Sequence, residues 1–523
     1  MGITPYEQWQ RWHKTGVYTT MPLLSKQPLG LSDNRIAVWT GAWEHAFPHA
    51  IILESGKQGR YTYLGLRPTS VIRGKGLEAV VSDDAASLGR QQQMSGKPLE
   101  VVRRWMEPYK APRLPDGPKW TGGCAGFWGY DVARYIEQLP QLAEDDLGLP
   151  DYLFMRFDEL WIIDHQEGEL YCAVSRHVDA TTGEEELHSL YESAVAQAEQ
   201  MTDLWSRLVE EDASEASIAS QRRRQDLLEG GRLDIDIEAL DGVSSPFSKH
   251  EFMAAVRRIQ SYIAAGDLFQ ANLSLRQTRE LASSPEEVYE WLRLVNPSPY
   301  MGFLRCPDFQ LVSGSPELLV ELQDGRLSGR PIAGTRRRGR TDEEEQRMIK
   351  ELQTNEKERA EHIMLVDLER NDLGRISSYG SVHVKELMVI EYYSHVMHLV
   401  SQVEGRLAEG KDAYDVIAAK FPGGTITGAP KIRTMEIIEE LEPVRRGPYT
   451  GSLGFIDYNG DMEFNIIIRT MAIKEGKVHI QAGAGIVIDS DPEREYYESL
   501  SKAKALWKAI QYSEQIAQET IIL

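Results

Sequence analysis

Cysteine is scarce in this sequence, and long apolar runs are missing from it. The 523 residues include only Cys124, Cys172 and Cys306. An odd number of widely spaced cysteines argues against a disulfide framework and is typical of free thiols in a reducing compartment, so we expect a cytoplasmic protein. No stretch of about 18 apolar residues occurs, and residues 1–18 contain no apolar run. The sequence therefore predicts neither a membrane span nor a signal peptide.

Basic residues are also in short supply. Lysine and arginine number 58 against 80 aspartates and glutamates, which gives a formal net charge of -22. This balance argues against a nucleic-acid partner, because phosphate binding requires a basic footprint. If the protein binds an anion, local basic groups or a metal ion must hold it.

The length and the local composition predict more than one region. At 523 residues the chain should form either two domains or one unusually large one. Residues 201–245 are rich in Glu, Asp, Ser and Arg, which predicts an acidic linker or a poorly ordered excursion. The resulting regions are 1–200, 201–245, 246–515 and a tail at 516–523. The first has strand-like runs but few polar clusters, and we interpret it as scaffold.

A helix is predicted directly after the acidic segment. Ser248 and Glu251 form a capping box, and Phe247 and Phe252 can form the hydrophobic staple that accompanies it. Apolar residues then recur at helical spacing until Gly266. Two further helices are predicted to begin at a Thr341/Glu344 capping box and at Asp491 followed by Pro492.

Strands are mixed with these helices. Residues 449–458 and 462–470 predict two strands joined by a type I′ turn at Asn-Gly 459–460, and 478–482 predicts a third. These strands would form an antiparallel meander. Because strands and helices do not alternate strictly, the pattern predicts an α+β fold rather than a doubly wound sheet.

Two pairs of glutamates have helical spacing. Glu358 and Glu361 are three residues apart, as are Glu495 and Glu498, so each pair projects from one face of a helix. Facing pairs would make a magnesium site, because Mg²⁺ prefers hard oxygen ligands and keeps positions for water and substrate oxygens. Taken alone, such pairs are more typical of solvated surface.

Glycine-rich segments occur at 422–431 and 483–485. Their backbone N–H groups could hold an anion. The spacing of a phosphate-binding loop is absent, so tight turns are the simpler interpretation.

Residues 122–126 (GGCAG) fit the nucleophile elbow of glutamine amidotransferases. His165 and Glu167 would complete the triad. Such an elbow follows a strand within a βαβ unit, whereas here the aromatic run 127–130 follows the cysteine. We therefore reject an internal glutaminase.

From about residue 245 to the C-terminus, the sequence closely resembles the chorismate-utilising enzymes. The motifs are 314–317 (GSPE), 331–335 (PIAGT), 361–362 (EH), 367–372 (DLERND), 395–398 (HVMH), 428–431 (GAPK), 468–470 (IRT) and 483–485 (GAG). The N-terminal half resembles the partner domain of these enzymes through 53–55 (LES), 59–61 (GRY) and 129–131 (GYD). So many matches in order argue against an accidental resemblance.

The resemblance implies a four-layer α/β/β/α core with mixed and antiparallel sheets. It also implies that Glu358, Glu361, Glu495 and Glu498 surround Mg²⁺, which holds the ring carboxylate of chorismate. The implied substrate contacts are Gly334, Thr335, His398 and Thr425 around the ring, and Tyr449, Arg469, Gly483, Ala484, Gly485 and Lys502 near the carboxylates. The arginine and lysine would solve the problem that the net charge poses for anion binding.

Three positions bear on the reaction. Glu317 matches the family's general acid, and we expect nearby carboxylates to raise its pKa so that it can protonate the departing ring hydroxyl. At Gln270 the water-using relatives have a lysine that activates water. Glutamine cannot do this, so we expect ammonia, delivered by a separate glutamine amidotransferase subunit. A non-catalytic regulatory homologue is disfavoured because every expected position is occupied.

Two amination products stay open. Ala333 stands where many enzymes of the aminodeoxychorismate branch have a lysine that attacks the ring, and alanine excludes that adduct. Residues 421–427 (FPGGTIT), 449–452 (YTGS) and 463–465 (EFN) nevertheless resemble this branch. We favour 4-amino-4-deoxychorismate, for p-aminobenzoate and folate biosynthesis, by a transaminase-class amination. The alternative is a lyase that makes anthranilate and pyruvate for tryptophan biosynthesis.

Ser55, Pro299, Tyr300 and Met301 match positions that contact tryptophan in the anthranilate enzymes. The simpler interpretation of the last three is a turn that enters a buried strand. The aminodeoxychorismate enzymes share much of this pocket, so tryptophan binding would not identify the product.

Overall fold

The computed structural model describes residues 2–31, 36, 38–56, 59–83, 91–231, 235–339, 341–392 and 396–522. The side chains of residues 335, 357, 396 and 517–522 are not described. Two predicted features therefore fall outside the described residues: His395 of the 395–398 motif, and residues 232–234 of the acidic segment.

The described strands form two sheets. The order of the first is β1 (Gly2–Ile3), β2 (Thr20–Pro28), β11 (Glu169–His177), β10 (Glu159–Asp164), β4 (Tyr61–Gly65), β3 (Ala50–Glu54), β13 (Tyr300–Arg305), β14 (Gln310–Ser315), β23 (Thr470–Lys474), β24 (Lys477–Ile486), β12 (Gln270–Glu280) and β20 (Gly428–Ala429). The order of the second is β17 (Ile332–Arg337), β19 (Val396–Arg406), β16 (Arg326–Gly329), β15 (Leu318–Gln323), β22 (Met462–Ile466), β21 (Ser452–Asp457), β8 (Gly123–Trp128), β9 (Tyr152–Phe157), β5 (Ser70–Lys75), β6 (Glu78–Ser82) and β7 (Gln91–Ser95), with β18 (His383–Tyr392) beside β19.

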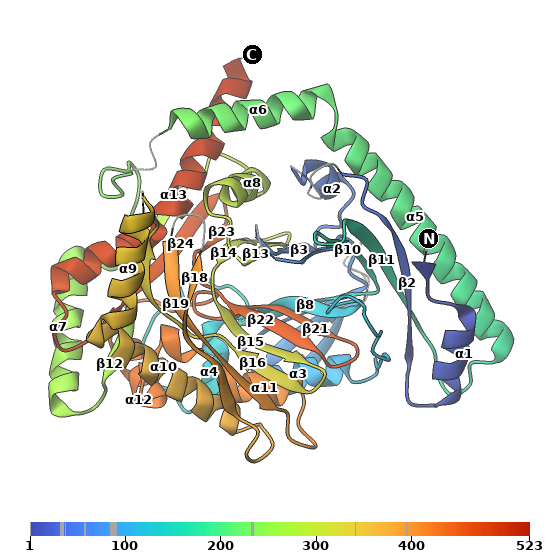
Figure 1. The fold of residues 1–523 in the computed structure, drawn as a ribbon, viewed down its shortest axis with the longest axis horizontal. Coiled ribbons are helices and arrows are strands. Elements are labelled where there is room, and N and C mark those ends of the chain that lie inside the picture. The colour runs from blue at the N-terminus through green and yellow to red at the C-terminus, as the bar shows by residue number, and fades with distance from the viewer. Residues whose placement is uncertain are drawn as a thin grey trace.

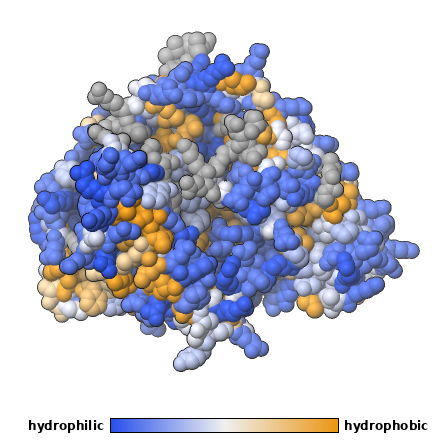
Figure 2. Space-filling model, in the orientation of Figure 1, coloured by the Kyte–Doolittle hydropathy of each residue, from blue (hydrophilic) through white to orange (hydrophobic). Residues whose placement is uncertain are grey.

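The helices surround these sheets (Figure 1). They are α1 (Tyr6–Lys14), α2 (Thr40–Glu44), α3 (Pro98–Met106), α4 (Ala133–Ile136), α5 (Glu184–Asp212), α6 (Glu215–Gly230), α7 (Lys249–Ala265), α8 (Pro285–Val295), α9 (Asp342–Thr354), α10 (Glu356–Gly374), α11 (Ala413–Lys420), α12 (Lys431–Leu441) and α13 (Pro492–Ile522), with short 3-10 turns η1 (Tyr130–Val132) and η2 (Gly424–Ile426). Among the described residues, no helix is long and apolar enough to cross a membrane. Hydrophilic side chains cover most of the face shown in Figure 2.

Three hydrophobic clusters define four layers. One lies between the sheets and includes Ile51 and Leu304 from the first sheet and Phe127 from the second. A second cluster joins the outer face of the first sheet to α1, α5, α7, α8 and α13, and a third joins the outer face of the second sheet to α3, α10 and α11. The predicted α+β class and the α/β/β/α layers are confirmed. The expected mixed sheet is not found, because every pairing between the described strands is antiparallel.

The two ends of the chain share both sheets. In the first sheet, β3 pairs with β13, so Glu54 lies opposite Met301. In the second sheet, β8 pairs with β21, so Trp128 lies opposite Ser452. The strands of the N-terminal region therefore extend both sheets of the C-terminal region.

The acidic segment differs from the prediction of a linker. Residues 201–212 complete α5, and α6 follows directly, so 201–230 are almost entirely helical. Met201, Leu204, Trp205 and Leu208 are buried against the core. Figure 1 shows α5 and α6 in green along the upper right edge of the molecule. The predicted tail at 516–523 likewise continues α13 through Ile522.

The helix predicted after the acidic segment is confirmed. In α7 the Ser248 side chain accepts from the N–H of Glu251, and the Glu251 carboxylate accepts in return from the N–H of Ser248. The Phe247 and Phe252 rings pack with their centroids 5.6 Å apart. Gly266 ends the helix at a φ of 83°, a left-handed conformation that glycine adopts without a steric penalty.

The predicted meander differs in two places. The 459–460 turn is not type I′, because Gly460 has a positive φ of 91° and Asn459 does not. The strand predicted over 462–470 ends at Ile466, and the chain then crosses to the first sheet and begins β23 at Thr470. Arg469 lies at this crossing with a φ of 52°. Such strain in a non-glycine residue is typical of functional sites.

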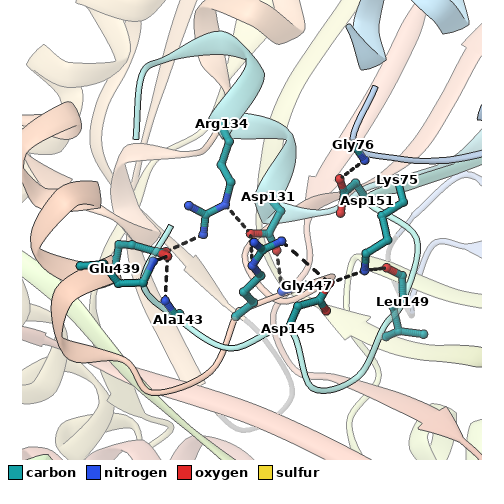
Figure 3. A network of polar contacts seen from close by, with 12 residues as sticks. Lys75, Gly76, Asp131, Arg134, Ala143, Asp145, Leu149, Asp151, Glu439 and Gly447 are labelled. Carbon is teal, nitrogen blue, oxygen red and sulfur yellow. Dashed lines mark hydrogen bonds and ion pairs between the residues drawn. The ribbon is translucent and has the colours of Figure 1, made fainter. Parts of the chain in front are cut away.

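A buried polar network holds the chain after α4 against α12 (Figure 3). Arg134 donates to Asp131 over 2.8 Å and pairs with Glu439, with both the Arg134 and Glu439 side chains 6% exposed. Glu439 also accepts from the N–H of Ala143 over 2.9 Å. Asp131 accepts from the N–H of Gly447 over 3.3 Å, so the network joins the two parts of the chain.

Replacing Glu439 with alanine should destabilise the protein by about 3–5 kcal/mol, because Arg134 would remain buried with fewer partners. We expect a correspondingly lower denaturation midpoint in urea, followed by circular dichroism. Asp367→Ala is the control, because the Asp367 and Arg370 side chains are 59% and 51% exposed, and such pairs contribute less than about 1 kcal/mol. Equal effects of the two substitutions would refute a structural role for the network.

Candidate functional site

A cavity of about 460 Å³ lies where strands of both sheets meet α10 and α13. Many of the predicted site residues line it: Gln270, Glu317, Ala333, Glu358, Glu361, Thr425, Tyr449, Arg469, Gly483, Gly485, Glu495, Glu498 and Lys502. They come from positions more than 200 residues apart in the sequence. The fold therefore gathers acids, cations and glycines in one place.

Four of the residues predicted to contact the substrate do not line the cavity. His398 lies beside it on β19, opposite Thr335 in the register and close enough to Arg469 for their charges to interact. Burial lowers the pKa of His398 to about 4, so the imidazole is neutral at physiological pH. Ala484 is fully buried on β24, and the Thr335 side chain is outside the described residues.

Gly334 lies behind the cavity wall at a φ of 66°. A Cβ there would be 2.8 Å from Oε2 of Glu358 and 2.7 Å from Leu352. A Cβ at Gly485 would be 2.6 Å from Nε2 of Gln270. At both positions a larger residue would displace the end of a side chain of the wall, and at Gly334 the positive φ adds a cost of its own.

The first glutamate pair projects from the start of α10. Asn355 caps this helix by accepting from the N–H of Glu358 over 3.0 Å. Oε1 of Glu358 is 2.7 Å from the guanidinium of Arg336. Glu361 accepts from Nε2 of Gln270 over 3.1 Å. Gln270 therefore contributes a hydrogen-bond donor, not a base, to this side of the cavity.

The second pair projects from the start of α13. Glu495 accepts from the hydroxyl of Ser490 over 2.7 Å, and Glu498 lies 3.0 Å from the ammonium of Lys502. Lys502 also donates to the carbonyl oxygen of Gly483 over 2.8 Å. This lysine is thus fixed between α13 and the glycine-rich end of β24, where it lines the cavity.

The four carboxylates supply the hard oxygen atoms that a magnesium ion requires. Oε2 of Glu358 is buried and has no hydrogen-bond partner among the described residues, which leaves one oxygen for a further ligand. In this structure, the described residues include no group of three His, Cys, Asp or Glu side chains close enough together to hold a metal ion. The donor set fits Mg²⁺, but its members must approach one another to bind it.

Arg469 is the second cation of the cavity lining, besides Lys502. No carboxylate among the described residues pairs with its guanidinium, and burial lowers the pKa of this group. A guanidinium that is desolvated without an acidic partner is costly unless a ligand neutralises it. Since guanidinium binds carboxylate with two parallel hydrogen bonds, the cavity is suited to an anionic carboxylate ligand.

Glu317 is the candidate proton donor. It immediately precedes β15, and only 8% of it is exposed. Burial raises its pKa from 4.5 to about 7, so a large fraction is protonated near neutral pH. The sequence predicts that neighbouring carboxylates cause this shift. Glu369 does contribute, but burial is the larger cause.

Several polar residues of the site were not predicted from the sequence. Asn272 lines the cavity with a buried Oδ1 that has no hydrogen-bond partner among the described residues. Strand alternation could have found it, because Asn272 is two residues from Gln270 on β12 and side chains two apart share a face. Arg336, Asn355 and Ser490 hold the glutamates, and no motif in the sequence identifies them.

The residues matched to a tryptophan pocket do come together. Ser55, Pro299, Tyr300 and Met301 line a separate cavity of about 30 Å³ between the sheets. That space admits about two water molecules. A tryptophan ligand would therefore require these side chains to move apart, and its binding stays a prediction.

The rejected amidotransferase elbow forms no catalytic turn. Residues 123–128 are β8, a buried strand of the second sheet, and Cys124 is fully buried. Burial raises the pKa of its thiol, which makes it a poor nucleophile. Cys172 and Cys306 are buried as well, and all three are free thiols, as predicted.

The cavity thus has the features of an enzyme that binds a carboxylate substrate and transfers a proton to it. A family model described as chorismate binding enzyme matches residues 48–508, and the chain belongs to this family. The aminodeoxychorismate synthase component 1 of Bacillus subtilis (strain 168) is 46% identical and aligns over 89% of this chain and 93% of its own. The anthranilate synthase component 1 of Acetivibrio thermocellus is 40% identical, over 88% and 89%.

A solved structure has the same fold. It is that of anthranilate synthase component I from Streptococcus pneumoniae TIGR4, with a TM-score of 0.66 and 33% identity. The match covers 87% of this chain and 93% of that one. The family resemblance deduced from the sequence motifs is therefore confirmed.

Proposed function

We propose that this chain converts chorismate and ammonia to 4-amino-4-deoxychorismate and water, as the first component of an aminodeoxychorismate synthase. The observation that carries the proposal is the placement of Arg469 and Lys502 in one cavity with Glu317 and the glutamates of α10 and α13. Chorismate has two carboxylates and a ring hydroxyl, which match the pair of cations, a metal ion held by the glutamates, and the proton donor. The similarity to the Bacillus subtilis enzyme supports the choice of reaction.

The carboxylates of the substrate would each have a different binding partner. Arg469 and Lys502, together with the hydroxyl of Tyr449, would hold one carboxylate. Glu358, Glu361, Glu495 and Glu498 would hold Mg²⁺, which when bound supplies positive charge for the ring carboxylate. The resulting fixed orientation would place the ring against Ala333 and Thr425, within reach of Glu317.

Glu317 would supply the proton for the departing hydroxyl. Ammonia forms the new C–N bond, the ring C–O bond breaks, and the oxygen leaves as water with the proton of Glu317. The attacking nitrogen then loses a proton, which restores the acid. Gln270 donates to Glu361 and cannot act as a base, so it would not activate a water molecule to compete with ammonia.

Ammonia would come from a separate glutamine amidotransferase. Relatives named component 1 imply a partner subunit, and the elbow-like residues 123–126 of this chain lie in the buried strand β8. Ammonium salt should therefore replace the partner in an assay of this chain alone.

Anthranilate is the second candidate product, because anthranilate synthases are 40% identical to this chain and Ala333 provides no nucleophile for a covalent adduct. To distinguish the two, the purified chain is incubated with chorismate, Mg²⁺ and ammonium at alkaline pH, with and without a lyase that releases p-aminobenzoate. Mass spectrometry and anthranilate fluorescence identify the products. A non-fluorescent amine that yields p-aminobenzoate only with the lyase is expected. Anthranilate and pyruvate without the lyase would overturn the proposal.

Magnesium binding is tested separately from turnover. Glu361→Gln should weaken Mg²⁺ binding in calorimetry by about tenfold or more, since it removes a charged oxygen ligand. Glu356→Gln is the matched control, because Glu356 makes the same charge change on α10 but is exposed and outside the cavity. If the two variants bind Mg²⁺ equally, the glutamates do not hold the ion.

A further inference from the structure

A small polar cavity adjoins the larger, catalytic cavity. It has a volume of about 20 Å³ and is lined by Glu317 and Thr425, which also line the catalytic cavity, and by Glu369, Asp372 and Lys420. A space of this size admits about one water molecule. Glu317 therefore lies where the two cavities adjoin, close to charged side chains that the proposed reaction does not use.

A buried ion pair lines the small cavity. Lys420, the last residue of α11, donates to Oε2 of Glu369 on α10, and the two side chains are 2% and 13% exposed. Oε1 of the same carboxylate is buried and has no hydrogen-bond partner among the described residues. A Cβ at Gly329 of β16 would overlap this atom, so a larger residue there would displace the carboxylate. Lys420 thus balances the charge of Glu369 at one oxygen only.

A second ion pair connects the neighbouring helix ends to the first pair. Lys431, the first residue of α12, donates to Oδ2 of Asp372 over 2.7 Å and to the carbonyl oxygen of Lys420 over 3.2 Å. Asp372 is three residues after Glu369 on α10, so the two carboxylates project from the same side of that helix. Thr425 lies in the segment between Lys420 and Lys431. The two pairs therefore hold both ends of the segment that carries this wall residue.

Stability alone does not account for an ion pair at this place. The cost of taking two charges out of water can exceed their attraction, so replacing a buried pair with apolar side chains of similar volume is often neutral or stabilising. The Glu369–Lys420 pair is buried beside a carboxyl group that must hold a proton to act as an acid. A negative charge near Glu317 opposes the loss of that proton, and a positive charge favours it. Of the two, Glu369 acts on Glu317 more strongly than Lys420 does.

The other charged or titratable groups around Glu317 lie mostly on the catalytic side. They are Arg469, Lys502, Tyr449 and the four glutamates of α10 and α13 in the catalytic cavity, and Asp372 in the small one. Lys502 favours loss of the proton, as Lys420 does. The charges of the catalytic cavity would change whenever a carboxylate ligand or a metal ion binds there. The Glu369–Lys420 pair is part of the protein interior and stays beside the acid.

We propose that Glu369 and Lys420 are positioning residues for the reaction, which act through Glu317 by setting how strongly its carboxyl group holds a proton. The use of Glu317 as an acid rests on the proposed function, but the effect on its proton exists in the chain without substrate. Glu369 would keep the proton on Glu317, and Lys420 would prevent the carboxyl group from holding it too tightly to release. Removal of the two charges should therefore have opposite effects, which a general loss of structure would not produce.

Thermal unfolding of the full chain at a series of pH values measures this proton without any reaction. The melting temperature of each protein is compared with that of the same protein carrying Glu317→Gln. The difference grows as the pH rises above the ordinary pKa of glutamate, and it stops growing at the pKa of Glu317 in the folded chain. This end point should lie about one pH unit lower in Glu369→Gln and about one pH unit higher in Lys420→Met than in the wild type.

Two further variants complete the test. Glu369→Gln/Lys420→Met removes both charges, so its end point should move in the same direction as that of Glu369→Gln but by less, because Glu369 acts more strongly. Glu439→Gln is the matched control, because it makes the same change in a buried ion pair that lines neither cavity. It should destabilise the protein and leave the end point unchanged.

An unchanged end point in the folded variants, or movement of both single variants in the same direction, would overturn the proposal. So would failure of all three variants to fold, because the pair would then be structural. If one single variant does not fold, the directions found for the other and for the double variant decide.

The effect on the reaction is measured with chorismate at a fixed concentration of unprotonated ammonia. The pH above which kcat falls should move in the same directions as the unfolding end points, with KM for chorismate little changed. A change in KM alone would refute a role that acts through the acid. An inactive chain whose unfolding still shows the opposite movements would refute the proposed reaction and leave the effect of the pair on Glu317 standing.

Discussion

Glu317→Gln should lower kcat for chorismate amination by at least about 100-fold, since general acids contribute about 10²–10⁴ in rate. KM for chorismate should change little, because the substituted amide keeps the size of the side chain. Steady-state kinetics with ammonium as nitrogen donor would measure both constants. An unchanged kcat would show that another group protonates the departing hydroxyl.

The same substitution should stabilise the protein, which separates a catalytic role from a structural one. The folded chain holds the proton of Glu317 more tightly than the unfolded chain, because burial raises the pKa from 4.5 to about 7. Wild-type stability is therefore lost as the pH rises between these values, by about 3 kcal/mol at 1.4 kcal/mol per pKa unit. Glu317→Gln has no proton to lose, so above pH 7 it should melt higher than the wild type. Equal melting temperatures across this range would contradict a buried, protonated Glu317.

Arg469→Ala should reduce kcat/KM for chorismate by about 10–100-fold, because a hydrogen bond to a charged group contributes about 1.5–3 kcal/mol. The variant should be no less stable than the wild type, because the guanidinium has no carboxylate partner among the described residues. Denaturation in urea and steady-state kinetics together test this combination. Arg469→Lys should recover only part of the activity, since lysine keeps the charge but loses the planar fork.

Arg446→Ala is the matched control for Arg469→Ala. Arg446 is 3% exposed, pairs with Glu442 over 2.7 Å, and donates to the carbonyl oxygens of Ile426 and Asn272. Its loss should destabilise the protein by about 3–5 kcal/mol. If Arg469→Ala destabilised the protein as much as Arg446→Ala, its role would be structural rather than in substrate binding.

Local rules of sequence predicted individual elements well. The capping box, the staple and the final glycine placed α7 within a residue, because these interactions are formed by neighbours in the chain. Residues 201–212 were misinterpreted although Met201, Leu204, Trp205 and Leu208 have helical spacing. The acidic composition of residues 201–245 as a whole favoured a linker over the helix that this spacing indicates.

The crossing after Ile466 could not be predicted from local pattern. Residues 462–470 are apolar enough for one continuous strand, and only tertiary structure divides them between two sheets. The left-handed Arg469 at the crossing is a local cost that the sequence does not reveal. Departures from local preference of this kind are expected where a site must be built.

The site itself was predicted by resemblance more than by physics. Spacing placed Glu358 and Glu361 on one helix face, but it could not show that the pair on α13 lines the same cavity. That fact depends on β12 and β24 pairing, which sets Asn272 opposite Gly485. Residues such as Arg336 and Ser490 were missed because their roles depend on which glutamate they contact.

The interleaving of early and late strands in both sheets has a consequence for synthesis of the protein. Two walls of the catalytic cavity, β24 and α13, are synthesised after all the other described strands and helices, and β3 has only one of its two neighbouring strands until β13 has been synthesised. The first 200 residues would therefore emerge with unpaired strand edges, which are prone to association with other chains. We expect the nascent chain to depend on chaperones until α13 is complete, and truncation before α13 to yield aggregates rather than a smaller folded protein.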